Sequence, residues 1–203
     1  MASKAKLKNS KAAHSAAYQH LIHSAELHRK AADECVDLIL GAAAVIVESF
    51  RDGKKLLICG NGGSAADAQH MAAEFVNRLS KEIERPGLPA IALTTDTSIL
   101  TSYANDYGYE GVFERQVLAL GNAGDTLITI STSGNSANLI KSVAAARHKG
   151  LTTIGLLGEG GALISLVDQA IVVPSRDTQQ VQECLLSIEH SICMIVEQEM
   201  FNS

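Results

Sequence analysis

The sequence predicts an α/β protein with a doubly wound, mostly parallel sheet of about five strands, flanked by helices and preceded by a helical arm. From residue 53 almost to the end, short β-branched runs alternate with helix-length segments, a pattern typical of repeated strand–helix–strand units. The runs are mostly apolar, as strands buried on both faces must be. Residues 10–50, by contrast, are Ala-rich and have helical spacing.

The first 52 residues predict one or two long helices. Residues 10–50 contain no proline and no glycine before Gly41, and their apolar side chains recur at helical spacing. Such a stripe, on a helix outside a compact domain, is usually buried against a partner subunit, because a monomer would leave part of it wet. We therefore expect an oligomerisation arm, residues 1–52, and a ligand-binding domain, residues 53–203.

The apolar runs set the expected elements of that domain. Strands are predicted at residues 55–59, 90–94, 126–131, 152–157 and 169–173. Helical periodicity covers residues 64–79, 109–119, 136–149 and 178–200. In such sheets ligands bind outside the carboxyl ends of the strands, so the residues directly after each strand are the candidate site residues.

The composition argues against several classes of protein. The net charge is -5 and no dense basic cluster is present, which disfavours a nucleic-acid binder that neutralises phosphates. No apolar run approaches the ~20 residues that a membrane span requires, and the first ten residues are too polar for a signal peptide. We expect a cytoplasmic protein without nucleic-acid or membrane partners.

The four cysteines are expected to be buried, reduced thiols. They are scattered among apolar neighbours without a C-x-x-C pair, which disfavours both a disulfide framework and a cysteine zinc site. They are Cys35, Cys59, Cys184 and Cys193.

A glycine-rich turn follows the first predicted strand and leads directly into a helix. It contains Gly60, Asn61, Gly62 and Gly63, with Ser64 placed to cap the helix. Glycines allow close approach to the backbone, and a helix start favours anions. The spacing matches neither the dinucleotide-binding nor the P-loop pattern, so a simple tight turn stays open as an alternative.

A hydroxyl-rich loop, residues 131–136, follows the third predicted strand. Four hydroxyls surround one glycine at the start of a helix, which favours a neutral donor site for a phosphate ester. A helix cap alone would need only one of them. The loop consists of Ser131, Thr132, Ser133, Gly134, Asn135 and Ser136.

Two further helices carry candidate chemistry. His70 and Glu74 are four residues apart, so they project from one helix face and suit two ligands of one metal or an acid–base pair, although a solvated contact is the commoner outcome. The last helix carries Gln182 and His190 among apolar residues. Eight residues span about 12 Å of helix, so spacing alone leaves open whether both reach one ion.

Five ordered motifs resemble the sugar isomerase (SIS) domain phosphoheptose isomerases, and the resemblance extends through nearly the whole chain. It implies a flavodoxin-like SIS fold and a cytoplasmic, zinc-containing homotetramer with active sites near subunit interfaces. The motifs lie at residues 59–64, 68–74, 105–108, 131–136 and 181–183 with His190.

The resemblance also implies roles for individual residues. One zinc ion per subunit would be bound by His70, Glu74, Gln182 and His190. The sugar would contact Asn61, Gly62, Gly63, Asn105, Asp106 and Gln182, and the phosphate would contact Ser131, Thr132, Ser133 and Ser136. Glu74 is expected to act as the base and His190 as its acid partner.

The implied reaction converts sedoheptulose 7-phosphate into D-glycero-D-manno-heptose 7-phosphate, an aldose–ketose isomerisation that starts the synthesis of nucleotide-activated heptose, as for lipopolysaccharide. Gln179, Gln180 and Leu185 depart from residues common in the family, which affects expected substrate contacts and leaves the metal set intact. The alternative is a non-catalytic SIS adaptor that binds the replication initiator, a type that has lost part of this set. A sugar-phosphate-sensing regulator would be expected to carry a further domain.

Overall fold

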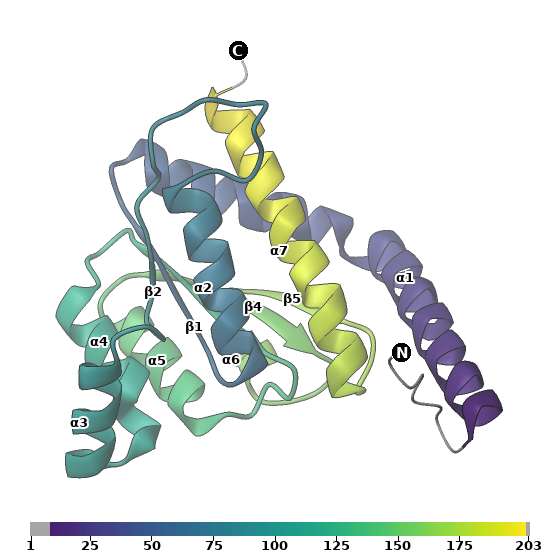
Figure 1. Ribbon diagram of the computed structural model, residues 1–203. Helices are drawn as coiled ribbons and strands as arrows, with labels where there is room; N and C mark the ends of the chain where they lie inside the picture. Colours follow the sequence, from purple (N-terminus) through teal and green to yellow (C-terminus); the bar gives the residue numbers. More distant parts are fainter. Residues whose placement is uncertain (1–8, 202–203) are drawn as a thin grey trace, which may run out of the picture.

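A computed structural model describes residues 9–201 and has one five-stranded, fully parallel sheet between two layers of helices (Figure 1). This confirms the predicted fold class. The strands are β1 (Leu56–Gly60), β2 (Ala90–Ala92), β3 (Thr126–Ser131), β4 (Thr152–Gly158) and β5 (Gln169–Val173). The helices are α1 (Ser10–Arg51), α2 (Gly63–Val76), α3 (Thr97–Tyr107), α4 (Val112–Leu120), α5 (Ala137–His148), α6 (Leu163–Leu166) and α7 (Thr178–Phe201), with a short 3-10 turn, η1 (Tyr109–Gly111).

The strand order fixes where a ligand can bind. The order is β2-β1-β3-β4-β5, so the chain leaves β1 toward one edge of the sheet and returns to β3 on the other side. Gly60 at the end of β1 is paired with Ile130 near the end of β3. The strand order reverses between these two strands, and their carboxyl ends border the crevice in which such sheets hold ligands.

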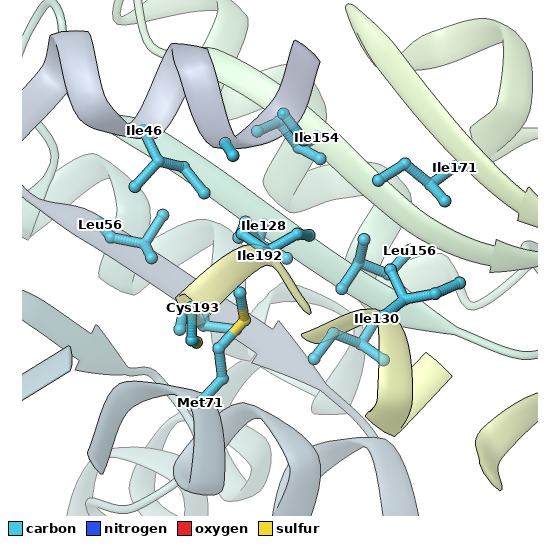
Figure 2. Packing of buried hydrophobic residues seen from close by; sticks show 14 of the residues in the cluster. Ile46, Leu56, Met71, Ile128, Ile130, Ile154, Leu156, Ile171, Ile192 and Cys193 are labelled. Atoms are coloured by element: carbon cyan, nitrogen blue, oxygen red, sulfur yellow. The ribbon is translucent and has the colours of Figure 1, made fainter. Parts of the chain in front are cut away.

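Alternating side chains of the strands fill two apolar cores. Ile58 and Ile128 face a core completed by α1, α2 and α7, while Leu57 and Leu127 face a core completed by α4, α5 and α6. Figure 2 shows the first of these cores, where Ile46 of α1 and Ile192 of α7 gather around the sheet residues. Helices α2 and α7 are therefore held rigidly on the same face of the sheet.

The first helix is continuous, and its two halves differ in burial. From Ala31 onward one stripe of α1 is part of the first core. The preceding half projects past α7 (Figure 1), and it exposes Tyr18 and Leu21 by 56% and 69%. This half contacts α7 through polar groups, with His20 Nε2 2.7 Å from Glu183 Oε1. The first eight residues of the expected arm lie outside the described residues.

Two differences from the expected elements have clear causes. Helix α3 was not predicted because its apolar stripe is short, and Leu100, Tyr103 and Ala104 are only partly buried against the second core. Strand β2 ends at Ala92 because this edge strand pairs with β1 over three residues only.

The start of α2 differs from the predicted one. Ser64 was expected to cap the helix, but the N-cap is Gly62, at φ 56°, and Ser64 lies inside the first turn. A positive φ of this kind favours glycine, which lets the chain enter the helix two residues earlier. Gly63 lies against the amide of Gln182, so a side chain at this position would displace that amide.

All four cysteines are free and buried, as expected. Burial raises the pKa of Cys59 to about 12 and that of Cys184 to about 11. Within residues 9–201, no helix has the length and apolar character needed to cross a bilayer.

Candidate functional site

His70, Glu74 and His190 converge where α2 packs beside α7. The two histidine Nε2 atoms are 2.9 Å apart, and Oε1 of Glu74 is 3.0 Å from His70 and 3.3 Å from His190. All three groups offer a ligand atom within 4.8 Å of the others. The i,i+4 spacing explains the first pair, and the packing of α7 on α2 supplies the third group.

This cluster has the donor chemistry of a divalent metal site. Two imidazole nitrogens and one carboxylate form a set that zinc prefers. Glu74 is 9% exposed, and its Oε2 atom has no hydrogen-bond partner among the described residues. A buried carboxylate oxygen without a partner is costly, and a bound cation would remove that cost. The residues present therefore fit a metal ion.

Gln182, on α7, lies outside this cluster and closer to the start of α2, beside Asp67 and Gly63. Its Nε2 donates to Asp67 Oδ2 at 3.1 Å, and its amide rests against Gly63. Burial raises the pKa of Asp67, and the hydrogen bond from Gln182 opposes that shift. Both residues line a cavity of about 310 Å³, to which Gln179 also contributes. Gln182 therefore links the glycine-rich turn to the α2–α7 interface.

Gln180, which differs from the residue common in the resembled family, does not line this cavity. Gln180 is 7% exposed, and its Nε2 donates to the backbone oxygen of His20 at 3.3 Å. It therefore contributes to the contact between α7 and α1.

Sequence reasoning missed Glu189, the residue before His190. Glu189 is fully buried, and both of its carboxylate oxygens lack a partner within residues 9–201. Burial, followed by the nearby charges of Asp67 and Glu74, raises the pKa of Glu189 to about 9. The only sequence signal was an acidic residue among the apolar residues of the last helix.

The hydroxyl-rich loop after β3 keeps its donors free of helix capping. Ser136 is the N-cap of α5, yet its side chain makes no capping hydrogen bond. Ser131 Oγ accepts from the Gly134 amide at 3.0 Å, and Ser133 Oγ accepts from the Asn135 amide at 3.4 Å. A hydroxyl that accepts can still donate its own hydrogen. The loop thus retains hydroxyl donors, and its role in phosphate binding stays a prediction.

A cavity of about 430 Å³ lies at the reversal point between β1 and β3. The expected residues Asn61 and Gly62 line it, together with residues that sequence reasoning missed, namely Tyr109, Glu110, Ala137 and Asn138. Asn61 and Asn138 hydrogen-bond to each other at 2.9 and 2.8 Å. Because Ala137 directly follows the hydroxyl-rich loop, this cavity borders both candidate ligand loops.

Asn105 and Asp106 lie elsewhere in the described chain. They are at the end of α3, where Asn105 Nδ2 donates to Asp106 Oδ1 at 2.9 Å. Asp106 lines a cavity of about 350 Å³ between α3 and α4, beside Tyr103 and Arg115. The structure therefore places Asp106 on a different cavity from Asn61.

Comparison with known proteins gives consistent matches along the chain. The SIS domain family matches residues 19–158. A phosphoheptose isomerase from Roseiflexus sp. (strain RS-1) is 54% identical over 179 residues, which are 88% of this chain and 90% of that protein. The solved phosphoheptose isomerases of Neisseria gonorrhoeae and Francisella tularensis match with TM-scores of 0.86 and 0.88, at 40% and 36% identity. They cover 91% and 92% of this chain and 98% of each solved chain.

Proposed function

The chain belongs to the SIS-domain phosphoheptose isomerases, and on that premise we propose that it converts sedoheptulose 7-phosphate into D-glycero-D-manno-heptose 7-phosphate. This reaction would supply heptose for nucleotide activation. The observation that carries the proposal is the convergence of His70, Glu74 and His190 beside the glycine-rich turn, which contacts Gln182 and Asn138.

The reaction requires a proton to move between neighbouring carbons of the sugar. A base removes the proton beside the carbonyl, and the negative charge that develops on oxygen must be stabilised. We assign the base to Glu74, whose Oε1 is held between two imidazoles, and the acid partner to His190. Burial keeps the Glu74 carboxylate at one position on α2, as a proton-transferring group requires.

Zinc is the cofactor that we propose, with one ion per subunit. His70, Glu74 and His190 would hold it. Gln182 is the proposed fourth ligand, because its amide lies against the same helix, α2, where it hydrogen-bonds to Asp67 and would have to turn toward the cluster. Zinc, when bound, supplies a Lewis acid that favours negative charge on the neighbouring substrate oxygens.

The remaining proposed contacts divide between the two ends of the substrate. Hydroxyl and amide donors of the loop after β3 would bind the phosphate, and the glycine-rich turn would bind the sugar. The phosphate residues are Ser131, Thr132, Ser133 and Ser136. The sugar residues are Asn61, Gly62, Gly63, Asn105, Asp106 and Gln182.

We propose that the working form is a cytoplasmic homotetramer in which residues 1–52 form the oligomerisation arm of the 53–203 domain. The exposed Tyr18 and Leu21 on the first half of α1 support this, because assembly would remove them from water. Asn105 and Asp106 would then serve a site near a subunit interface.

The alternative is a non-catalytic adaptor with the same fold. The intact His70, Glu74 and His190 cluster favours the enzyme, because an adaptor does not need converging metal-binding groups. The decisive experiment incubates purified protein with sedoheptulose 7-phosphate and follows the aldoheptose phosphate by chromatography. Absence of product from metal-loaded protein would favour the adaptor.

A further inference from the structure

Two asparagine side chains join the loops of the site across the reversal point of the sheet. Asn61 stands in the glycine-rich turn after β1, and Asn138 stands in the first turn of α5. Nδ2 of Asn61 donates to Oδ1 of Asn138 at 2.9 Å, and the reverse hydrogen bond is 2.8 Å. Asn138 is only 5% exposed, so water competes little for this pair.

The pair determines what Asn61 can offer a ligand. An amide oxygen accepts two hydrogen bonds, and its nitrogen donates two. Oδ1 of Asn61 receives Asn138 and, at 3.4 Å, the hydroxyl of Tyr109. Its acceptor sites are therefore filled, whereas one N–H of Nδ2 stays free among the described residues. Asn61 consequently faces the cavity as a donor.

We propose that Asn138 is a positioning residue of this site. It acts through Asn61, turning the free N–H of that side chain toward an oxygen of the bound sugar. The same pair ties the glycine-rich turn to the helix that follows the phosphate loop, so the two ends of the ligand are held at a fixed separation. This inference rests on the proposed function, since it takes the ligand to be a sugar phosphate spanning both loops.

A double-mutant cycle tests whether Asn138 works through Asn61. The variants are Asn61→Ala, Asn138→Ala and the pair, each metal-loaded, with kcat and KM measured for sedoheptulose 7-phosphate. Each single variant removes the buried pair of hydrogen bonds, so we expect each to lower kcat/KM by about 10- to 100-fold. The double variant should lose no more than Asn61→Ala alone, while the affinity for inorganic phosphate changes less than about threefold.

Thr153→Val is the control. Thr153 is also a buried polar residue, 0% exposed, and it lies at the start of β4, at the opposite end of the sheet from both loops, where its hydroxyl donates to Asp168 Oδ2 at 2.7 Å. Its loss should lower Tm and leave kcat/KM unchanged. Asn138→Asp provides a second variant of nearly identical shape if Asn138→Ala does not fold. It retains an acceptor and loses the donor to Asn61, so kcat/KM should fall at least fivefold.

Two results would overturn the role of Asn138. One is a kcat/KM within twofold of wild type in folded Asn138→Ala or Asn138→Asp protein. The other is a set of losses that add in the double variant, since Asn138 would then act independently of Asn61. If wild-type protein binds sedoheptulose 7-phosphate without converting it, the proposed function fails, and the same cycle is measured as affinities by calorimetry. Absence of binding by the wild type would overturn both.

Discussion

His190 presents its Nε2 atom to Nε2 of His70 at 2.9 Å, although the two residues are 120 positions apart in the chain. Both nitrogens also lie within 3.3 Å of the same oxygen of Glu74. At this separation only one of the two nitrogens can carry a hydrogen between them, so the other serves as acceptor. A cation accepts lone pairs from all three groups, so we propose that they share one metal and act in one reaction.

Glu74→Gln should abolish isomerisation while preserving the fold. The amide keeps the size of the side chain but cannot accept a proton from carbon, and loss of a general base typically costs 10²- to 10⁴-fold, about the fall expected in kcat. Affinity for inorganic phosphate, measured by calorimetry, should be unchanged. Glu82→Gln, at an exposed position, is the control and should retain full activity. Near wild-type turnover by Glu74→Gln would show that another group is the base.

Metal binding should depend on both histidines. His70→Ala and His190→Ala each remove a direct ligand, and we expect a loss of more than about 100-fold in zinc affinity, since even second-shell changes cost 10- to 100-fold. Competition with a chromophoric chelator measures this without reference to activity. His14→Ala, on the exposed first half of α1, is the control. Equal affinities in all three variants would refute the assigned site.

Replacing Glu189 with leucine should stabilise the metal-free protein. Its buried carboxyl has no partner among the described residues, and its neighbours on α7 include Leu185 and Ile192. Burying such a polar group costs about 1–3 kcal/mol, which an apolar side chain of similar size recovers. Urea unfolding at pH 7 in the presence of chelator should show the gain. A less stable variant would mean that Glu189 has a stabilising contact in the assembled protein.

The ionised Asp125 carboxylate should add to the free energy of unfolding, and this contribution should be lost in acid. Burial alone would raise the pKa of Asp125, but hydrogen bonds from Lys55 and Asn122 outweigh it, and the pKa lies below its ordinary value. A lowered folded-state pKa gives stability that is present above the unfolded pKa, 3.8, and is lost as pH falls through the folded value.

Asp125→Asn tests this at the start of β3. The variant leaves the Lys55 contacts without a charged acceptor, so we expect it to be less stable by about 1–3 kcal/mol at pH 7. Denaturant unfolding as a function of pH should show this difference shrinking below about pH 4, where wild type also loses the charge. A difference that stays constant down to pH 2 would contradict the assignment.

The sequence pattern predicted most of the fold for identifiable reasons. Strands β3 and β5 begin and end where their apolar runs do, because both are bounded by polar or turn-forming residues. Helix α3 escaped prediction because its short apolar stripe is only partly buried. The Ser64 cap was wrong because Gly62 adopts a positive φ that sequence spacing does not reveal.

The site was only partly predictable, since part of it depends on packing between distant elements. His70 and Glu74 follow from helical spacing alone. The approach of His190 depends on how α7 lies beside α2, and the Asn61–Asn138 pair depends on the adjacency of β1 and β3. Neither contact has a local sequence signal. Asn138 was therefore missed, although it lies only two residues after the predicted phosphate loop.

The central claim is that the cluster of His70, Glu74 and His190 makes this chain a metal-dependent sugar phosphate isomerase. The most direct measurement follows conversion of sedoheptulose 7-phosphate into an aldoheptose 7-phosphate by purified protein, first as isolated, then after chelation, then after zinc is restored. We expect conversion that is lost with the metal and regained with it, and no conversion by Glu74→Gln under any of these conditions. Conversion that persists after complete metal removal, or is absent from zinc-loaded protein, would contradict it.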